Sequence, residues 1–357
     1  MSTAGHTKTL AELRSADSAA FGGKSATLGE LIAAEIPVPP GFAVSTSAFR
    51  DFVAGAGLAG RIETELGRMS PDDVDSVGAA SHAISEAMRF APMPDAVRDE
   101  IVVRYAELAE EAGVDEPPVA VRSSALGEDS QDATFAGQQE TYLWVRGADH
   151  VADAVRDCWV SLYSPPAISY RARFAETAGE AAMGVAVQLM VDAEVSGVMF
   201  TCNPVSGDPS MVAVNASWGL GLAVVGGEVT PDDFLVSKVT GEVVREHVHS
   251  KDVEYVPDAG GRGAVRVEVP EERRSTPCLD AAALEALVDV AGRVQRYFGS
   301  HQDVEWALAR GRELPESLHV VQSRPVTALP RREQPPVAGS AMSLVMSMFG
   351  AGGRSEG

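Results

Sequence analysis

DVEWAL (303–308) and LHVVQSR (318–324) are the two segments that decide the fold prediction. Side chains alternate between the two faces of a strand, so Asp303 and Glu305 share one face of the first segment. Gln322 and Arg324 share a face of the second segment for the same reason. The two segments lie close together in the chain and predict an antiparallel hairpin.

The polar face of this hairpin carries groups that could bind a ligand. If the register puts Glu305 on the side of Gln322 and Arg324, a carboxylate, an amide oxygen and a guanidinium converge. The two oxygen donors suit Mg²⁺, which prefers oxygen ligands and keeps some waters. Arg324 would then contact a phosphate oxygen. A surface salt bridge between Glu305 and Arg324 is the competing interpretation, and the hairpin alone does not separate the two.

The segments that precede this hairpin mix strands and helices. Apolar runs and helical spacing predict strands at 119–121, 184–191, 197–200 and 211–214, and helices within 47–113. A further helix is expected between Asp280 as N-cap and Gly299 as C-cap. TPDD (230–233) is expected to be a turn. Because the strands and helices follow no regular βαβ order, the sequence predicts an α+β fold.

Two basic side chains occupy positions that suit phosphate binding. Arg122 follows an apolar strand and precedes two serines and a Gly-containing segment, a combination that can wrap phosphates. Lys24 lies at a predicted helix start, where backbone amides and an ammonium suit an anion. The segment is not a P-loop, because Ser18 stands where that motif needs glycine. A structural arginine and a solvent-exposed lysine are the alternatives.

The composition limits the classes of function. A formal net charge of −22 argues against nucleic-acid binding, which needs a basic face. The three cysteines form no C-x-x-C pair, which indicates neither a disulfide framework nor a thiolate zinc site and suits a reducing cytoplasm. No stretch approaches the roughly 20 apolar residues of a membrane-spanning helix. We therefore expect a cytoplasmic protein that binds neither nucleic acid nor membrane.

Taken in order, a set of short segments resembles the N-terminal nucleotide-binding module of the phosphoenolpyruvate synthase and pyruvate phosphate dikinase family. The matching segments are GGKS (22–25), LGEL (28–31), VPPGF (38–42), VRSS (121–124), FAGQ (135–138), SGVMFT (196–201), NP (203–204), PD (231–232), DVEWA (303–307) and QSRP (322–325). The resemblance implies an α+β ATP-grasp fold of two subdomains, with the nucleotide between them. The implied division is residues 1–190, residues 191–328 and a flexible tail at 329–357.

The resemblance also implies a role for each matching position, with ATP and Mg²⁺ as cofactors. The implied roles are phosphate-contacting cations at Lys24 and Arg122, a loop over the phosphates at Gly137, Gln138 and Thr141, the adenine and ribose pocket at Gln188, Mg²⁺ ligands at Glu305 and Gln322, and a γ-phosphate contact at Arg324. Lys24, Arg122 and Arg324 would be the catalytic cations. The segment 123–140 is the expected moving part.

The sequence departs from the family pattern in two respects. WGLGL (218–222) has Leu222 where the family has a glutamate, and whether Glu228 replaces that carboxylate is open. Family members also carry a histidine that takes the β-phosphoryl group of ATP, leaving AMP and phosphate. None of the seven histidines here has a suitable Gly-rich setting, and none follows Arg324. The resemblance therefore implies a partner that supplies this histidine.

The functional expectation is a phosphotransferase of the dikinase type whose histidine lies on a separate subunit. The Gly-rich ending at 350–357 is interpreted as a native terminus, which favours a split enzyme of the phenylphosphate synthase or 4-alkylphenyl phosphate synthase type. The acceptor would then be a phenol such as 4-cresol, bound mainly elsewhere. The alternatives are an excised domain of a phosphoenolpyruvate synthase or rifamycin phosphotransferase, a non-catalytic nucleotide sensor, and a direct ATP ligase that releases ADP.

Overall fold

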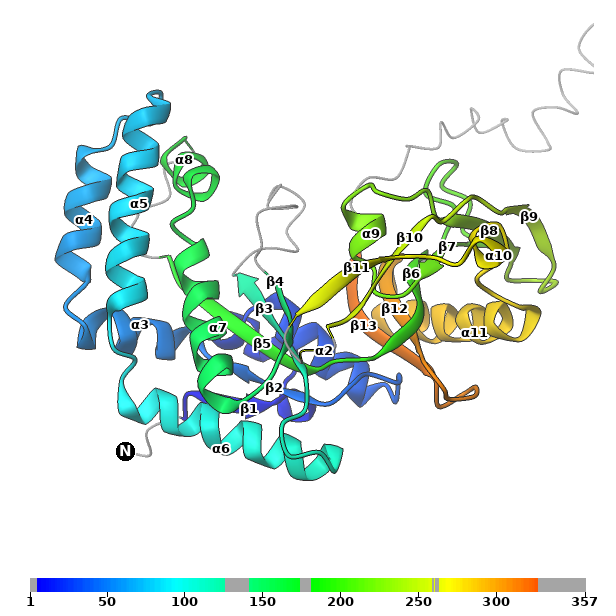
Figure 1. Cartoon of the computed structure of the whole chain (residues 1–357), viewed down its shortest axis with the longest axis horizontal. Coiled ribbons are helices and arrows are strands. Elements are labelled where there is room, and N and C mark those ends of the chain that lie inside the picture. The colour runs from blue at the N-terminus through cyan, green and yellow to red at the C-terminus, as the bar shows by residue number, and fades with distance from the viewer. Residues whose placement is uncertain (1–4, 126–140, 174–180, 259, 261–262, 327–357) are drawn as a thin grey trace, which may run out of the picture.

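The computed structural model describes residues 5–125, 141–173, 181–258, 260 and 263–326. These residues form two larger sheets and one two-stranded hairpin, with helices packed beside the sheets (Figure 1). All strand pairs within the described residues are antiparallel, so the predicted α+β class is confirmed. Among the helices in this part of the chain, none has the length and apolar character needed to cross a membrane.

The first sheet has the strand order β1-β2-β5-β3-β4. Its strands are β1 (Thr7–Thr9), β2 (Gly41–Val44), β3 (Val119–Ala125), β4 (Thr141–Val145) and β5 (Met183–Leu189). Arg122 lies opposite Ala186 on one neighbouring strand and opposite Thr141 on the other. Gln188 lies opposite Ala120, so it shares a face of the sheet with Arg122. The predicted strands at 119–121 and 184–191 are confirmed.

Helices pack on the reverse side of this sheet. α3 (Thr46–Gly55), α6 (Asp95–Ala112) and α7 (Ala148–Ser161) contact its strands. α5 (Val74–Phe90) packs on α7, and α4 (Ala59–Arg68) and α8 (Pro165–Arg173) pack on α5. Trp159 stacks on Phe52 with ring centroids 5.3 Å apart, and Val121 and Val187 of the sheet belong to the same core. Because apolar side chains fill this side, Arg122 is left on the side that faces the second sheet.

Two short helices, α1 (Ser18–Phe21) and α2 (Gly23–Ala33), follow the 3-10 turns η1 (Leu10–Glu12) and η2 (Ser15–Asp17). Gly22 joins α1 to α2 with a φ of 84°, and a Cβ at this position would lie 2.1 Å from the carbonyl oxygen of Ser124. Only glycine permits this conformation and this approach. The start of α2, which carries Lys24, is therefore fixed against the end of β3.

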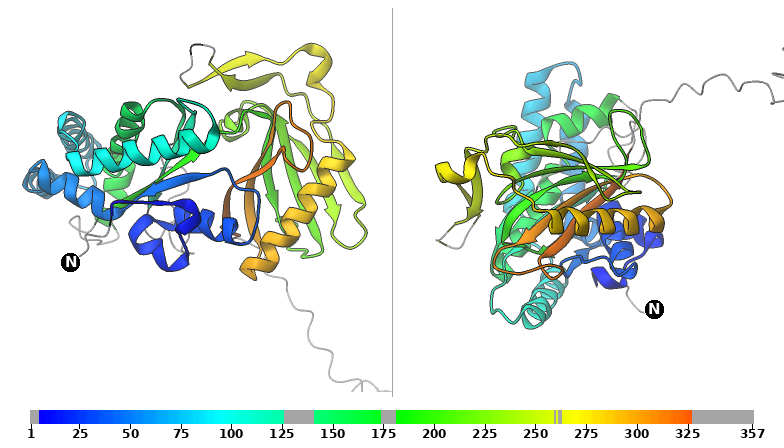
Figure 2. Two further views of the ribbon diagram at one scale, coloured as in Figure 1. Left: turned by 90° about the horizontal axis from the view of Figure 1, so that it is seen from below. Right: turned by 90° about the vertical axis from the view of Figure 1, so that its right-hand side faces the viewer.

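The second sheet has the order β13-β12-β6-β7-β8-β9. Its strands are β6 (Ala193–Phe200), β7 (Met211–Trp218), β8 (Asp232–Ser237), β9 (Val243–His247), β12 (Gln302–Ala309) and β13 (Leu318–Pro325). The helix α11 (Ala281–Phe298) runs along one face of it (Figure 2) and shares its core. Asp280 caps this helix by accepting a 2.8 Å hydrogen bond from the amide of Ala283, and Gly299 ends it with a φ of 66°. Both predicted caps are confirmed.

The connections of this second sheet carry the smaller elements α9 (Leu222–Val225), β10 (Val253–Pro257), β11 (Ala264–Glu268) and α10 (Glu271–Arg274). The expected turn at 230–233 is wrong in its second half, because Asp232 and Asp233 begin β8. Asp232 is fully buried against Lys251, which holds it inside the sheet.

The chain passes from the first sheet to the second between Leu189 and Ala193. The proposed subdomain limits at 190 and 328 stay predictions.

Candidate functional site

The hairpin β12–β13 has the register that the polar-face hypothesis needs. Glu305 lies opposite Gln322, and Asp303 lies opposite Arg324. Opposed residues of an antiparallel pair lie on the same face, so these four side chains share one polar surface. Val304, on the reverse face, is fully buried in the core. The predicted hairpin is confirmed.

Arg122 reaches this polar surface from the first sheet. Its Nη1 donates a 3.1 Å hydrogen bond to the carbonyl oxygen of Val321. The same nitrogen lies 3.5 Å from Oε1 of Gln322 and 3.9 Å from Oε2 of Glu305. The buried Nε of Arg122 has no hydrogen-bond partner among the described residues. The guanidinium of Arg122 thus faces two side-chain oxygens, which belong to strands far away from β3 in the sequence.

Arg324 has a different partner from the one that the salt-bridge interpretation named. Its Nε donates a 2.8 Å hydrogen bond to Oδ2 of Asp303 rather than to Glu305. The register explains this choice, because Asp303 is the residue directly opposite Arg324. Burial raises the pKa of Asp303 above its ordinary value, against the lowering effect of Arg324. Asp303 was missed as a site residue, although the alternation along the strand already placed it on the polar face.

The first turn of α2 brings Lys24 next to the strand that carries Arg122. The amide of Ser25 donates a 3.2 Å hydrogen bond to Oγ of Ser124, two residues beyond Arg122. Lys24 is partly buried at this helix start. The two cations that the sequence singled out therefore come from segments that are bonded to each other. A helix start with an ammonium beside it favours an anion.

The remaining candidate residues lie on or beyond the first sheet. Thr141 begins β4 directly opposite Arg122. Gln188 is 2% exposed, and its Nε2 donates a 3.3 Å hydrogen bond to the carbonyl oxygen of Pro39. Gly137 and Gln138 lie outside the described residues.

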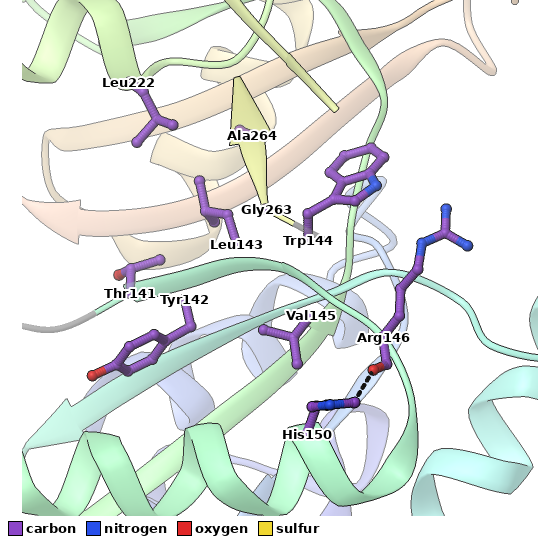
Figure 3. Close-up of a pocket in the computed structure, with 10 residues that line it drawn as sticks. All are labelled: Thr141, Tyr142, Leu143, Trp144, Val145, Arg146, His150, Leu222, Gly263 and Ala264. Atoms are coloured by element: carbon purple, nitrogen blue, oxygen red, sulfur yellow. Dashed lines mark hydrogen bonds between the residues drawn. The ribbon is translucent and has the colours of Figure 1, made fainter. Parts of the chain in front are cut away.

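A cavity of about 390 Å³ lies between β4 and the connections of the second sheet (Figure 3). Thr141 and Leu143 line it from β4, and Leu222 and Ala264 line it from α9 and β11. Its lining is mainly apolar, which is typical of pockets for flat organic groups. No sequence signal connects these segments, because the contact between β4 and β11 arises only in the fold.

Glu228, the possible substitute for the family glutamate, lies away from this cavity lining. Its Oε1 accepts a 2.6 Å hydrogen bond from the hydroxyl of Tyr255, and its Oε2 accepts a 2.8 Å bond from Nε of Arg266. Both oxygens are thus engaged with the hairpin β10–β11. Leu222 itself faces the cavity, so the position of the family carboxylate is apolar here.

The donor set on the hairpin is small but chemically suited to a hard cation. Among the described residues, no group of three or more His, Cys, Asp or Glu side chains could hold a metal ion. Glu305 and Gln322 nevertheless offer two oxygens from opposed positions, and the guanidinium of Arg122 lies 3.9 Å or less from both. Two protein oxygens fit Mg²⁺ when phosphates and waters complete its shell.

Comparison with known families gives a match over most of the chain. The family described as pyruvate phosphate dikinase, AMP/ATP-binding domain, matches residues 18–343. The chain belongs to this family. The match includes Lys24, Arg122 and the whole β12–β13 hairpin, so the site described above lies inside the dikinase-type nucleotide-binding domain.

Curated relatives of this dikinase-type domain are much longer proteins. The probable phosphoenolpyruvate synthase of Archaeoglobus fulgidus is 40% identical over 325 residues, which cover 91% of this chain and 42% of that protein. The corresponding protein of Methanothermobacter thermautotrophicus is 37% identical over 346 residues, which cover 97% of this chain and 49% of that protein. The chain spans less than half the length of these relatives.

Likeness to solved structures is weak. The ADP complex of N5-carboxyaminoimidazole ribonucleotide synthetase is 10% identical, with a TM-score of 0.24, and covers 72% of this chain and 58% of that chain. This similarity is too low to support a conclusion.

Proposed function

We propose that this chain binds ATP with Mg²⁺ between its two sheets and activates the phosphates for transfer to a histidine outside the chain. The observation that carries the proposal is the convergence of Arg122 with Glu305 and Gln322. Two oxygen donors and a guanidinium at one place match the needs of a metal-bound polyphosphate. Family membership supplies the nucleotide class.

Each protein group has a separate task in this proposal. Lys24, Arg122 and Arg324 spread the negative charge that the phosphates carry and develop during transfer. Glu305 and Gln322 would hold the metal, which when bound neutralises charge on the phosphate oxygens.

The remaining candidates position the nucleotide. Thr141, with Gly137 and Gln138, would contact the phosphates from the segment that ends at β4. The cavity beside Leu143 and Leu222 would take the nucleoside. Gln188 would act from outside the cavity lining, where it fixes the segment around Pro39.

The proposed reaction passes the β-phosphoryl group of ATP to the histidine and leaves AMP and phosphate. The nucleophilic histidine would belong to a partner subunit or to a further domain, because none of the candidate site residues is a histidine. In the split arrangement the final acceptor is a phenol such as 4-cresol. The names of the curated relatives favour a second candidate, an acceptor of the phosphoenolpyruvate synthase type.

Product analysis with ATP labelled in the β-phosphate tests the proposal. The full chain would be incubated with Mg²⁺, alone and with a candidate histidine-bearing protein, with phenol, 4-cresol or pyruvate. AMP formation that requires the histidine-bearing protein supports the proposal, and acceptor dependence identifies the acceptor. ADP from this chain alone would mean an independent kinase or ligase.

Variants separate catalysis from nucleotide sensing. Glu305→Ala and Arg324→Ala should abolish AMP formation, whereas Arg245→Met, which removes a cation from β9 at the far edge of the same sheet, should not. If the Glu305 and Arg324 variants keep full AMP formation, the catalytic proposal is wrong.

A further inference from the structure

Arg122 contacts the same two oxygens that are proposed to hold the metal. Its Nη1 lies 3.5 Å from Oε1 of Gln322 and 3.9 Å from Oε2 of Glu305. A metal ion bonded to these oxygens at about 2.1 Å would lie close to this nitrogen. The guanidinium carries a fixed positive charge, so the two cations repel each other there.

The contacts of Arg122 with the two side chains are loose, whereas its backbone contact is firm. The bond to the carbonyl oxygen of Val321 measures 3.1 Å, but the distances to Gln322 and Glu305 exceed those of a strong hydrogen bond. The Arg122 side chain is only 14% exposed, so solvent screens its charge weakly. Its buried Nε also lacks a partner within the described residues. These features suit a side chain that exchanges one set of acceptors for another.

We propose that Arg122 and the metal ion compete for Glu305 and Gln322, and that the phosphates of ATP end this competition by binding Arg122 in place of these two residues. The inference rests on the proposed function and adds an order of assembly to it. A phosphate group within hydrogen-bond distance can accept two parallel bonds from a guanidinium, whereas Glu305 lies too far from Arg122 to accept a strong one. When ATP draws Arg122 away, Glu305 and Gln322 become available, and the metal binds together with the nucleotide rather than before it.

The same exchange has a consequence for the two sheets. The bond from Arg122 to Val321 joins β3 of the first sheet to β13 of the second. Moving Arg122 onto a phosphate would break this direct bond and replace it with one that passes through the nucleotide. ATP would therefore become the link between the two sheets at this point.

Binding of Mn²⁺ alone, followed by electron paramagnetic resonance, tests the competition without any turnover. Mn²⁺ takes oxygen ligands as Mg²⁺ does. Without nucleotide, Arg122→Met in the full chain should bind Mn²⁺ about 10- to 100-fold more tightly than wild type, because one positive charge beside the ligands is gone. Arg122→Gln also removes the charge but keeps a polar side chain, and it should behave alike, so a folding defect of one variant does not decide the result. Adding Glu305→Ala to either variant should abolish the gain.

Arg245→Met is the matched control, since it also removes one arginine and frees a carboxylate, that of Asp233, on the same sheet. It should leave Mn²⁺ affinity within about twofold of wild type. If wild type and both Arg122 variants bind Mn²⁺ equally tightly, or if none of them binds it, the proposed competition is wrong. A further titration with the β,γ-imido analogue of ATP then separates the two proposals. If the wild-type chain binds Mn²⁺ only when the analogue is present, the proposed ATP site is supported. If chain, Mn²⁺ and analogue form no ternary complex, the proposed ATP site is wrong as well.

Discussion

Two groups of charged side chains, one beside the second sheet and one between the two sheets, are built in opposite ways. In one, Lys251 and Asp232 are both fully buried, and Nζ of the lysine lies 2.6 Å from Oδ1 of the aspartate. Asp232 also accepts hydrogen bonds from the amides of His249 and Cys278 at 3.0 and 2.9 Å. In the other, Arg122 stands 3.9 Å from a Glu305 side chain that is 39% exposed.

The difference separates a structural charge pair from the proposed binding site. The Asp232–Lys251 pair is dry, short and surrounded by hydrogen bonds, so it has no capacity left for a ligand and would be costly to disturb. The cluster of Arg122, Glu305 and Gln322 is open and loosely spaced, with a buried Nε that lacks a partner among the described residues. Such incomplete pairing is tolerated where a ligand completes it. Burial and hydrogen-bond saturation therefore distinguish the two clusters, whereas the presence of charge does not.

The largest expected effect is on stability, at the dry pair. Lys251→Met leaves Asp232 buried without its counter-charge and should lower the free energy of unfolding by about 3–5 kcal/mol. Urea unfolding measures this loss. The control Arg245→Met breaks the partly exposed pair with Asp233 and should cost no more than about 1 kcal/mol. If both variants lose a similarly small amount of unfolding free energy, the proposed distinction between the buried pair and the more exposed charges is wrong.

At the open cluster, the expected effect is on activity. Arg122→Met should lower AMP formation with the proposed histidine-bearing protein by about 10²–10³-fold, because the proposed role of this cation is to stabilise the transferring phosphates. Its free energy of unfolding should fall by no more than about 2 kcal/mol, because the one firm contact that is lost is the bond to the carbonyl oxygen of Val321. Measured rates and urea unfolding of the same preparation check both halves. A large loss of stability with intact activity would make Arg122 a structural residue.

A smaller effect is expected in the apolar cavity. Leu222→Trp adds bulk to the wall opposite Thr141 and should raise KM for ATP about tenfold while leaving kcat nearly unchanged, because nucleoside contacts act on binding. Steady-state kinetics of AMP formation separate the two constants. An unchanged KM would place the nucleoside elsewhere.

The smallest expected effect is the pH dependence of Asp303. Burial raises its pKa above the ordinary 3.8, so the folded protein binds this proton more tightly than the unfolded chain does. Its contribution to stability is therefore complete below the ordinary pKa and is lost as pH rises through the raised value. Asp303→Asn removes this component. Urea unfolding at several pH values should show wild type losing stability relative to the variant as pH rises, and a constant difference would contradict the raised pKa.

The sequence anticipates the polar face of the hairpin but not its pairing. Alternation along a strand placed Glu305 with Gln322 and Arg324, and the structure confirms the shared face. The partner of Arg324 depends on register, which turn geometry and packing determine, and the structure gives Asp303. The approach of Arg122 to Val321 is a contact between distant segments that no local pattern encodes.

The failures elsewhere have a similar physical cause. TPDD (230–233) has the composition of a turn, yet Asp232 lies in a strand because Lys251 pairs with it inside the fold. The cavity wall at Leu222 and Ala264 likewise comes from two separate connections of the second sheet. In contrast, the caps at Asp280 and Gly299 act within a few residues, and the sequence predicted both correctly.

The most direct test of the central claim is calorimetric titration of the full chain with ATP, with and without Mg²⁺. Wild type and the double variant Glu305→Ala/Gln322→Ala would be compared, with Arg245→Met as control. If these oxygens hold the metal, Mg²⁺ should tighten ATP binding by about tenfold or more in wild type and in the control, and should have no effect in the double variant. The same Mg²⁺ dependence in all three proteins would contradict the assignment of the site to this hairpin.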